Sequence, residues 1–209
     1  MATLINQAIS AVLQVALFTL IPFLFFLFRR NKQITFGQYI GFYNPTRKSM
    51  QYTFATLLLF LAVGVGFAFL DDGIRQAVTS PKSVTGQLRQ MGFSVESVTT
   101  LLLIALIKTS LSEEIFFRGF IAKRLIASLG FNVGNVAQAV IFGLVHLLLF
   151  WLIVKSSPFT LVFFFLFSGF AGWLIGYIKE KFANGSIIPG WMAHGLGNTL
   201  SYAIIAFLL

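Results

Sequence analysis

Glu113, Glu114 and Arg118 lie within an apolar stretch, Thr99 to Phe120, that is long enough to cross a membrane. A charged side chain near the centre of a bilayer costs at least roughly 2.5–3.5 kcal/mol, so ionisable groups there usually pair, line a cavity or take part in chemistry. On a helix, Glu114 and Arg118 are four residues apart and can pair on one face. Glu113 is rotated by about 100° from Glu114 and therefore needs a different partner.

The only two histidines of the chain, His146 and His194, also lie in hydrophobic segments. Helical spacing gives each of them a companion. His194 and Asn198 are four residues apart and point the same way, and Phe142 lies one turn before His146 and can form a wall beside it. Three titratable groups on three expected membrane helices suggest a single site.

These side chains comprise a carboxylate, two imidazoles and an amide. A low-dielectric pocket makes a carboxylate a stronger base, so Glu113 together with His146 could hold and deprotonate a water molecule. His194 and Asn198 could donate hydrogen bonds to a developing oxyanion. The residues therefore predict hydrolysis of a peptide bond without a nucleophilic side chain. Glu114 and Arg118 would fix the position of the helix and the local electric field.

Other chemistries use some of the same residues. Two histidines and a glutamate can hold a zinc ion that activates water, but the histidines lie on different helices and no H-E-x-x-H pattern is present, so we expect no cofactor. Ser168-Gly169, the one candidate for a rhomboid-type serine nucleophile, lacks the preceding Gly-x. A buried glutamate could also relay protons in a proton-coupled transporter, and a non-catalytic membrane scaffold or self-immunity protein is a further alternative.

The elements that position these residues must be membrane helices. Hydrophobic residues make up 57% of the 209 residues and charged residues 10%, whereas a soluble domain has about 25% charged residues. The composition predicts an all-α, polytopic transmembrane bundle that uses residues 1–209 as one domain. The net charge of +9 is explained by membrane topology, so we expect no nucleic-acid partner. The expected partners are the lipid bilayer and a peptide or membrane-protein substrate.

Apolar runs of about 20 residues mark the expected spans, because that length crosses a hydrocarbon core of about 30 Å. The sequence contains six such runs: Ile9–Phe28, Gln51–Leu70, Thr99–Phe120, Val136–Val154, Phe159–Tyr177 and Ile187–Leu209. The longest polar stretch between them, Asp71 to Ser97, is expected to form an irregular or short-helical cap.

Lysine and arginine separate between the two sides of this arrangement. The first, third and fifth loops contain Arg29, Arg30, Lys32, Arg47, Lys48, Lys123, Arg124, Lys179 and Lys181, whereas the second and fourth contain Arg75, Lys82, Arg89 and Lys155. By the positive-inside rule the first group is cytoplasmic, so both termini are expected outside a cell (plasma) membrane. Counting helical rise from this side places Glu113, His146 and His194 in one layer of the cytoplasmic half.

Three motifs resemble those of the CAAX protease and bacteriocin-processing (CPBP, or Abi) family. They are Glu113-Glu114-x-x-x-Arg118, Phe142-x-x-x-His146 and His194-x-x-x-Asn198, which occur in the family's order, each on an expected membrane helix. The resemblance covers residues 99–198. The eukaryotic prenyl-protein endopeptidases are expected to have about eight membrane helices, whereas this chain has about six. The chain therefore looks like a compact bacterial member of the family.

The resemblance implies a glutamate-type intramembrane endopeptidase that cuts near the cytoplasmic side of the membrane. By motif position, Glu113 and His146 would activate the water, His194 and Asn198 would form the oxyanion site, and Glu114 and Arg118 would support them. Relatives of this kind process peptides or surface proteins, or act in bacteriocin maturation and self-immunity. The sequence leaves open the substrate, the use of prenylated substrates and the oligomeric state.

Overall fold

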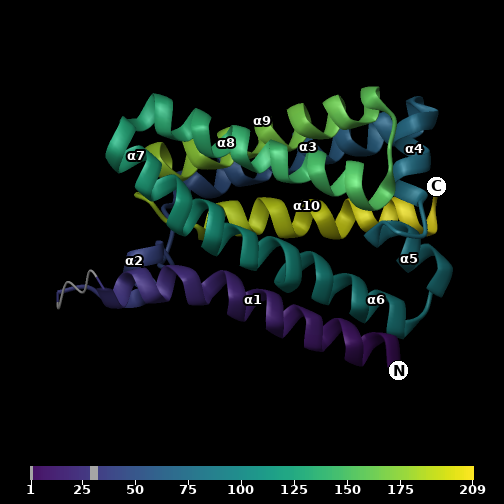
Figure 1. Ribbon diagram of the computed structural model, residues 1–209, viewed down its shortest axis with the longest axis horizontal. Coiled ribbons are helices and arrows are strands. Elements are labelled where there is room, and N and C mark those ends of the chain that lie inside the picture. Colours follow the sequence, from purple (N-terminus) through teal and green to yellow (C-terminus); the bar gives the residue numbers. More distant parts are fainter. Residues whose placement is uncertain (1, 29–32) are drawn as a thin grey trace.

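The computed structural model describes residues 2–28 and 33–209, and these residues form helices without a strand. Most of the helices run along the long axis of the molecule (Figure 1). Five of them are long and apolar enough to cross a membrane: Thr3–Phe28, Arg47–Leu70, Val95–Leu129, Phe131–Val154 and Pro158–Phe182. The protein is therefore a polytopic helical membrane bundle, which confirms the predicted fold class.

The elements follow one another in a simple order. They are α1 (Ala2–Phe28), α2 (Phe36–Ile40), α3 (Arg47–Leu70), α4 (Asp72–Thr79), α5 (Val84–Met91), α6 (Val95–Leu102), η1 (Leu103–Leu111), η2 (Glu114–Ala122), α7 (Lys123–Leu129), α8 (Phe131–Leu149), η3 (Phe150–Val154), α9 (Pro158–Phe182) and α10 (Ile188–Phe207). The three η elements are π-helical and continue their neighbouring α-helices.

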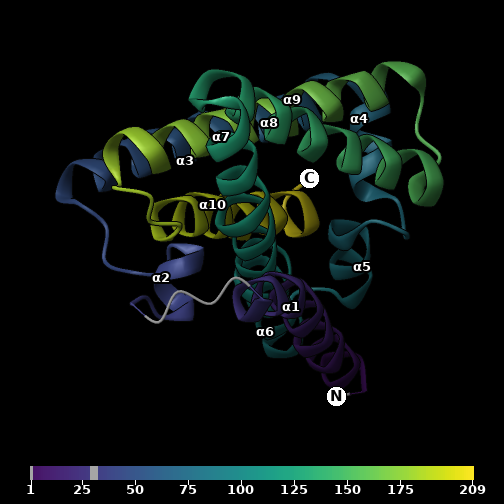
Figure 2. The ribbon, with the colours of Figure 1, turned by 60° about the vertical axis from the view of Figure 1, so that its left-hand side comes forward.

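The sixth expected span, Ile187–Leu209, corresponds to α10 but differs from the other five. This helix has 20 residues, which is long enough to cross a membrane. It is not among the described helices that are also apolar enough to do so. Its glycines and the polar His194 and Asn198 lower its hydropathy. It packs against α3 and η1 and lies in the middle of the bundle (Figures 1 and 2), so its position is explained by helix packing rather than by lipid contact.

The expected boundaries were too short for several helices. The helix predicted at Thr99–Phe120 runs from Val95 to Leu129 and contains two long π-helical segments, and the helix predicted from Gln51 begins at Arg47. Hydropathy detects only the apolar part of a helix, whereas polar caps extend it. At Arg47 the preceding Thr46 accepts a hydrogen bond from the Ser49 amide at 3.1 Å and so caps the first turn.

One end of the bundle, which we call the basic end, is formed by α2, α7 and residues 183–187 (Figures 1 and 2). Hydrogen bonds hold its segments together: the Ile187 amide donates to the Gly41 carbonyl at 2.9 Å, and the Ser186 hydroxyl donates to the Tyr43 carbonyl at 2.6 Å. Burial and the negative charge of Glu180 raise the pKa of Tyr43, so its hydroxyl stays a neutral donor to the Asn184 carbonyl. Arg29, Arg30 and Lys32 of the charge count lie outside the described residues.

The opposite end, which we call the terminal end, contains α4, α5, the start of α1 and the end of α10 (Figure 1). Both short helices begin with a side-chain cap. Asp71 accepts from the Ile74 amide at 2.8 Å, and Ser83 accepts from the Gly86 amide at 3.0 Å. These helices confirm the expected short-helical cap within Asp71–Ser97.

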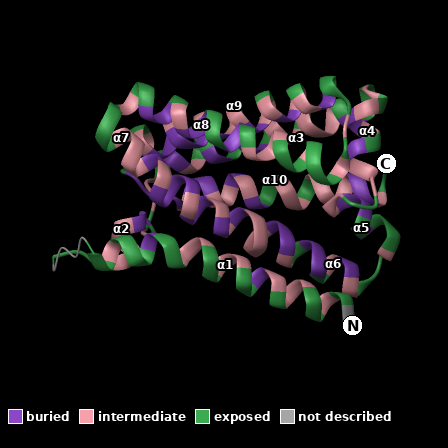
Figure 3. Ribbon diagram, viewed as in Figure 1, coloured by how far each residue is buried: buried purple, intermediate pink, exposed green. Residues whose placement is uncertain are grey.

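Buried residues gather on the inner faces of η1, η2, α8, α9 and α10, whereas α1 is largely exposed at the side of the bundle (Figure 3). Polar side chains also join the helices. Gln138 on α8 donates to the Gly172 carbonyl of α9 at 2.8 Å, and Gln14 on α1 donates to the Lys108 carbonyl at 2.8 Å. These contacts help to fix the segments that carry the predicted site residues.

Candidate active site

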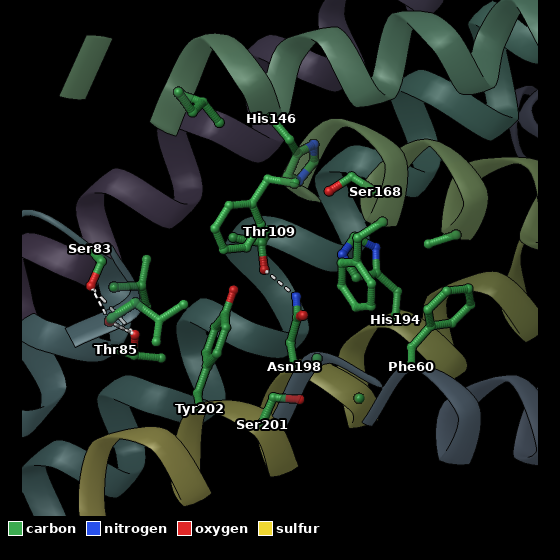
Figure 4. Close-up of a pocket in the computed structure, with 18 of the residues that line it drawn as sticks. Phe60, Ser83, Thr85, Thr109, His146, Ser168, His194, Asn198, Ser201 and Tyr202 are labelled. Carbon is green, nitrogen blue, oxygen red and sulfur yellow. Dashed lines mark hydrogen bonds between the residues drawn. The ribbon is translucent and has the colours of Figure 1, made fainter. Parts of the chain in front are cut away.

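The predicted site residues come together around one cavity. Its volume is about 370 Å³, and it lies between α3, α4, α8, α9, α10 and the π-helical part of the third span (Figure 4). Five of the seven residues named from the sequence line it: Glu113, Phe142, His146, His194 and Asn198. The other two, Glu114 and Arg118, lie directly behind this lining and are fully buried.

Glu113 lies between η1 and η2, where it faces the cavity. Its side chain is 15% exposed, and its Oε2 atom is buried without a hydrogen-bond partner among the described residues. The nearest basic group in an ion-pair contact is His194, whose Nε2 lies 3.9 Å from Oε2. The carboxylate of Glu113 is therefore placed to accept a hydrogen bond from a molecule in the cavity.

His146 is oriented by its own helix. Its Nδ1 atom lies 2.9 Å from the Phe142 carbonyl oxygen, which can only accept a hydrogen bond, so Nδ1 carries a proton and donates. The Nε2 atom is then the free nitrogen of the neutral ring. Figure 4 shows the ring of His146 directed into the cavity from α8. The backbone bond thus selects the tautomer that could accept a proton there.

His194 and Asn198 follow one another along the cavity face of α10. The His194 Nδ1 atom lies 3.4 Å from Glu114 Oε1, which leaves Nε2 facing Glu113. The Asn198 amide donates to the Thr109 hydroxyl at 3.4 Å (Figure 4) and to the Ser110 hydroxyl, also at 3.4 Å. Because both contacts are long, the amide can turn toward a bound oxygen atom without losing a strong bond.

Glu114 and Arg118 form the pair expected from their spacing. Arg118 Nη1 lies 3.3 Å from Glu114 Oε1, and both side chains are 0% exposed. The guanidinium also lies over the ring of Phe142, with 4.0 Å between Cζ and the ring centroid. Phe142 is therefore held between this cation and the ring of His146, whose centroid is 4.5 Å away.

The geometry adds one feature to the sequence-based pairing. Among the described residues, the ion-pair contact of Glu113 is with His194, whereas the sequence paired Glu113 with His146. Both carboxylates of the Glu113-Glu114 motif thus reach the same imidazole, one at each ring nitrogen. Helical spacing could not distinguish the two histidines because each lies on a different helix from Glu113.

The structure also brings residues into the cavity that the sequence did not single out. Thr109, Ser201 and Tyr202 line it, and Figure 4 shows the Tyr202 side chain beside Asn198. Tyr202 follows Asn198 by four residues, so the helical stripe that begins at His194 could have indicated it. Ser168, the residue rejected as a serine nucleophile, also lines the cavity.

The candidate metal ligands of the site are its two histidines and the adjacent glutamates. Within residues 2–28 and 33–209, no group of three or more His, Asp or Glu side chains is arranged to hold one. The contacts of the imidazoles explain this: His146 Nδ1 is bonded to a backbone carbonyl, and both nitrogens of His194 face carboxylates.

Comparison with protein families identifies the chain. Residues 95–200, slightly more than half of the chain, match the family described as type II CAAX prenyl endopeptidase Rce1-like. The chain belongs to this family. The matched residues of this Rce1-like chain include all three motifs and every predicted site residue.

Comparison of this Rce1-like chain with curated proteins and with solved structures gave no match. Family membership makes it a membrane peptidase, in agreement with its five apolar helices. Such an enzyme needs a group that activates a nucleophile, and Glu113 is a carboxylate that lines the cavity.

Proposed function

We propose that this Rce1-like protein is an intramembrane endopeptidase in which Glu113 activates the attacking water without a metal. One observation carries the proposal: Glu113, whose Oε2 atom has no hydrogen-bond partner among the described residues, lines a cavity that also contains two imidazoles and an amide. An unpaired buried oxygen is costly, so it is expected where a ligand supplies the missing partner. Water is the smallest ligand that does so.

In the proposed reaction, water lies between the Glu113 carboxylate and His146 Nε2. Glu113 takes a proton from the water as the oxygen attacks the carbonyl carbon of the substrate. His146 accepts a hydrogen bond from the second water proton and so directs the attacking lone pair. Its bond to the Phe142 carbonyl holds this orientation.

The negative charge that forms on the substrate oxygen is assigned to α10. The Asn198 amide donates one hydrogen bond, and His194 Nε2 donates a second when its ring is protonated. Glu114 supports that ring through Nδ1 at 3.4 Å. When the tetrahedral intermediate collapses, the carbon–nitrogen bond breaks and the proton held by Glu113 passes to the leaving amine.

The charge distribution supports an orientation for this reaction. With the basic end in the cytoplasm, the catalytic layer lies in the cytoplasmic half of the cell membrane and both termini lie outside. We propose that the cut is made in that half, in a peptide or a membrane-protein substrate.

The proposal is tested by terminal-peptide mass spectrometry of cells that produce the wild type or Glu113→Gln at matched abundance. General base catalysis contributes about 10²–10⁴-fold, so new termini should appear with the wild type and be lost with the variant. His146→Ala should lose them as well. The chelator EDTA should leave cleavage by the purified wild type unchanged.

Gly66→Ala serves as the control, because a Cβ at Gly66 meets no atom within 4 Å and this residue lies outside the cavity lining. The proposal is wrong if Glu113→Gln and His146→Ala both leave cleavage intact. Loss of cleavage with chelator would replace the glutamate mechanism by a metal-dependent one.

A further inference from the structure

The cavity extends in only one direction from the catalytic residues. Its lining continues through apolar side chains of α3, α9 and η3 to α4 and to the start of α5; the residues concerned include Phe60, Phe150, Phe163, Phe164, Phe167 and Val84. These segments lead to the terminal end of the bundle (Figure 1). The catalytic residues therefore form the floor of a long apolar cavity rather than its centre.

The opposite direction is closed by packing. Behind the floor lie Glu114 and Arg118, both 0% exposed, and Lys179 beyond them is 1% exposed. Gly190 packs so closely here that a Cβ would lie 2.5 Å from Glu114 Oε2. Among the described residues that line the cavity, none comes from α2, α7 or residues 183–187. The basic end thus offers no route to Glu113.

The cavity opens where its lining becomes exposed. Lys82, in the turn before α5, is exposed, and Leu149 and Ile153 near the end of the fourth span are 45% and 47% exposed. We call these three residues the mouth. The mouth combines one cationic side chain at the terminal end of the bundle with two apolar side chains on the side of the bundle.

From this geometry we infer that the substrate enters through the mouth and reaches Glu113 as an extended, mainly apolar peptide segment. This inference rests on the proposed peptidase function. The lining on the fourth span runs from His146 to Ile153, roughly 10 Å along the helix. An extended chain advances by about 3.3 Å per residue, so about three residues of the segment follow this distance. Its side chains would contact the phenylalanine lining.

A peptide in an apolar cavity must also satisfy its backbone hydrogen bonds, because an unsatisfied group in such surroundings costs several kcal/mol. Hydroxyl groups of Ser168, Ser201 and Tyr202 lie along the deep part of the cavity (Figure 4). They supply donors and acceptors that a hydrocarbon chain would not need. This distribution favours a peptide over a lipid acyl chain as the occupant.

The entry route has a consequence for topology. With the basic end in the cytoplasm, the mouth belongs to the outer side, so the substrate approaches Glu113 from that side. The mouth is defined by the molecule itself, so the route can be tested without assigning either side.

The chain contains no cysteine, which allows single thiols to be placed at will. The substitution Lys82→Cys places one at the mouth. Ser128→Cys is the matched control: Ser128 is exposed and lines a second pocket, at the basic end, with Gln38, Tyr39, Lys123 and Arg124. Each purified variant is treated with a polyethylene glycol maleimide, and cleavage of a substrate found by terminal-peptide mass spectrometry is compared before and after labelling.

Labelling of the Lys82→Cys variant should slow cleavage by about tenfold or more relative to the same variant without label, because the polymer blocks the mouth. Tenfold corresponds to about 1.4 kcal/mol. Labelling of the Ser128→Cys variant should leave the rate unchanged. Slowing in the Ser128→Cys variant alone, in both variants or in neither would overturn the inferred route. Each pair is repeated with Glu113→Gln: cleavage that persists there refutes the proposed function and not the route.

A second measurement identifies the occupant. Benzophenone maleimide attached to the thiol of Lys82→Cys, in the Glu113→Gln background, should crosslink on illumination to the substrate polypeptide. The same probe on the Ser128→Cys variant should not. Crosslinks to lipid alone from the probe at the mouth would show that an acyl chain fills the cavity and would overturn the peptide assignment.

Discussion

At the scale of single residues, the two adjacent glutamates of the third span both contact His194. Its two ring nitrogens face Glu113 at 3.9 Å and Glu114 at 3.4 Å. Glu114, the inner carboxylate, also pairs with Arg118. The Arg118 guanidinium, the Glu114 carboxylate and the His194 imidazole therefore form one chain of contacts. We propose that Glu114 is structural in this arrangement, whereas Glu113 lines the cavity and takes part in the chemistry.

Glu114→Gln tests this division of roles. Removing one partner of a buried ion pair costs about 3–5 kcal/mol, because Arg118 would remain charged without a counterion. We expect lower abundance and a lower thermal midpoint in detergent. Glu113→Gln should keep both near the wild-type values while losing cleavage.

The matched control replaces both partners, as in Glu114→Gln with Arg118→Met, which removes the uncompensated charge. This double variant should recover much of the lost abundance. If Glu114→Gln accumulates normally and is simply inactive, the inner carboxylate takes part in the chemistry and the assignment is wrong.

At the scale of elements, the π-helical segments change how the third span presents its side chains. η1 and η2 have nine residues each and lie on either side of Ser112 and Glu113. A π-turn uses more residues than an α-turn, and such turns often occur at functional sites. The Thr109 hydroxyl lies within this altered ladder and donates to the Ile104 carbonyl five residues earlier at 2.9 Å.

The packing of α10 against this span depends on Gly190. A Cβ there would lie 2.5 Å from Glu114 Oε2 and 2.6 Å from Ile175 Cγ2, so Gly190→Ala must displace these two side chains or α10 itself. Overpacking of this kind costs about 1–3 kcal/mol. We expect a lower thermal midpoint and slower cleavage, because His194 lies one turn further along the same helix.

Gly66→Ala again provides the control, since its Cβ meets open space and replacing a helical glycine by alanine favours the helix by about 0.5–1 kcal/mol. Its thermal midpoint should be unchanged or higher. Equal thermal midpoints and equal activities for Gly190→Ala and the wild type would contradict the close approach of α10 to Glu114.

At the scale of the whole molecule, the start of α1 and the end of α10 lie at the same end as α4 and α5 (Figures 1 and 2). The basic residues Lys123, Lys179 and Lys181 lie near the other end. The cavity mouth therefore shares an end with both termini, and the orientation of the chain decides from which side a substrate approaches.

Epitope tags at the two termini should consequently be accessible to antibody from one and the same side of intact cells. The positive-inside rule predicts the outside. Two tags reached only after permeabilisation would reverse the orientation while keeping the bundle. Tags on opposite sides would show that α10 does not cross the membrane.

The sequence alone determined the membrane fold and the membership of the site, because both are encoded locally. Apolar runs specify helices that cross lipid, and the four-residue spacings of Glu114–Arg118 and His194–Asn198 place their side chains on one face. A buried charge is so costly that an ionisable group in such a helix usually pairs with another group, lines a cavity or takes part in chemistry. Neither property depends on how the helices pack.

Only the tertiary structure decided which groups meet and how they are reached. That His194 rather than His146 lies at ion-pair distance from Glu113 depends on how α10 packs against the π-helical span. The closed floor at Gly190 and the mouth at Lys82 likewise arise from segments far apart in the chain. Contacts between helices depend on their relative rotation and depth, and periodicity within one helix does not contain that information.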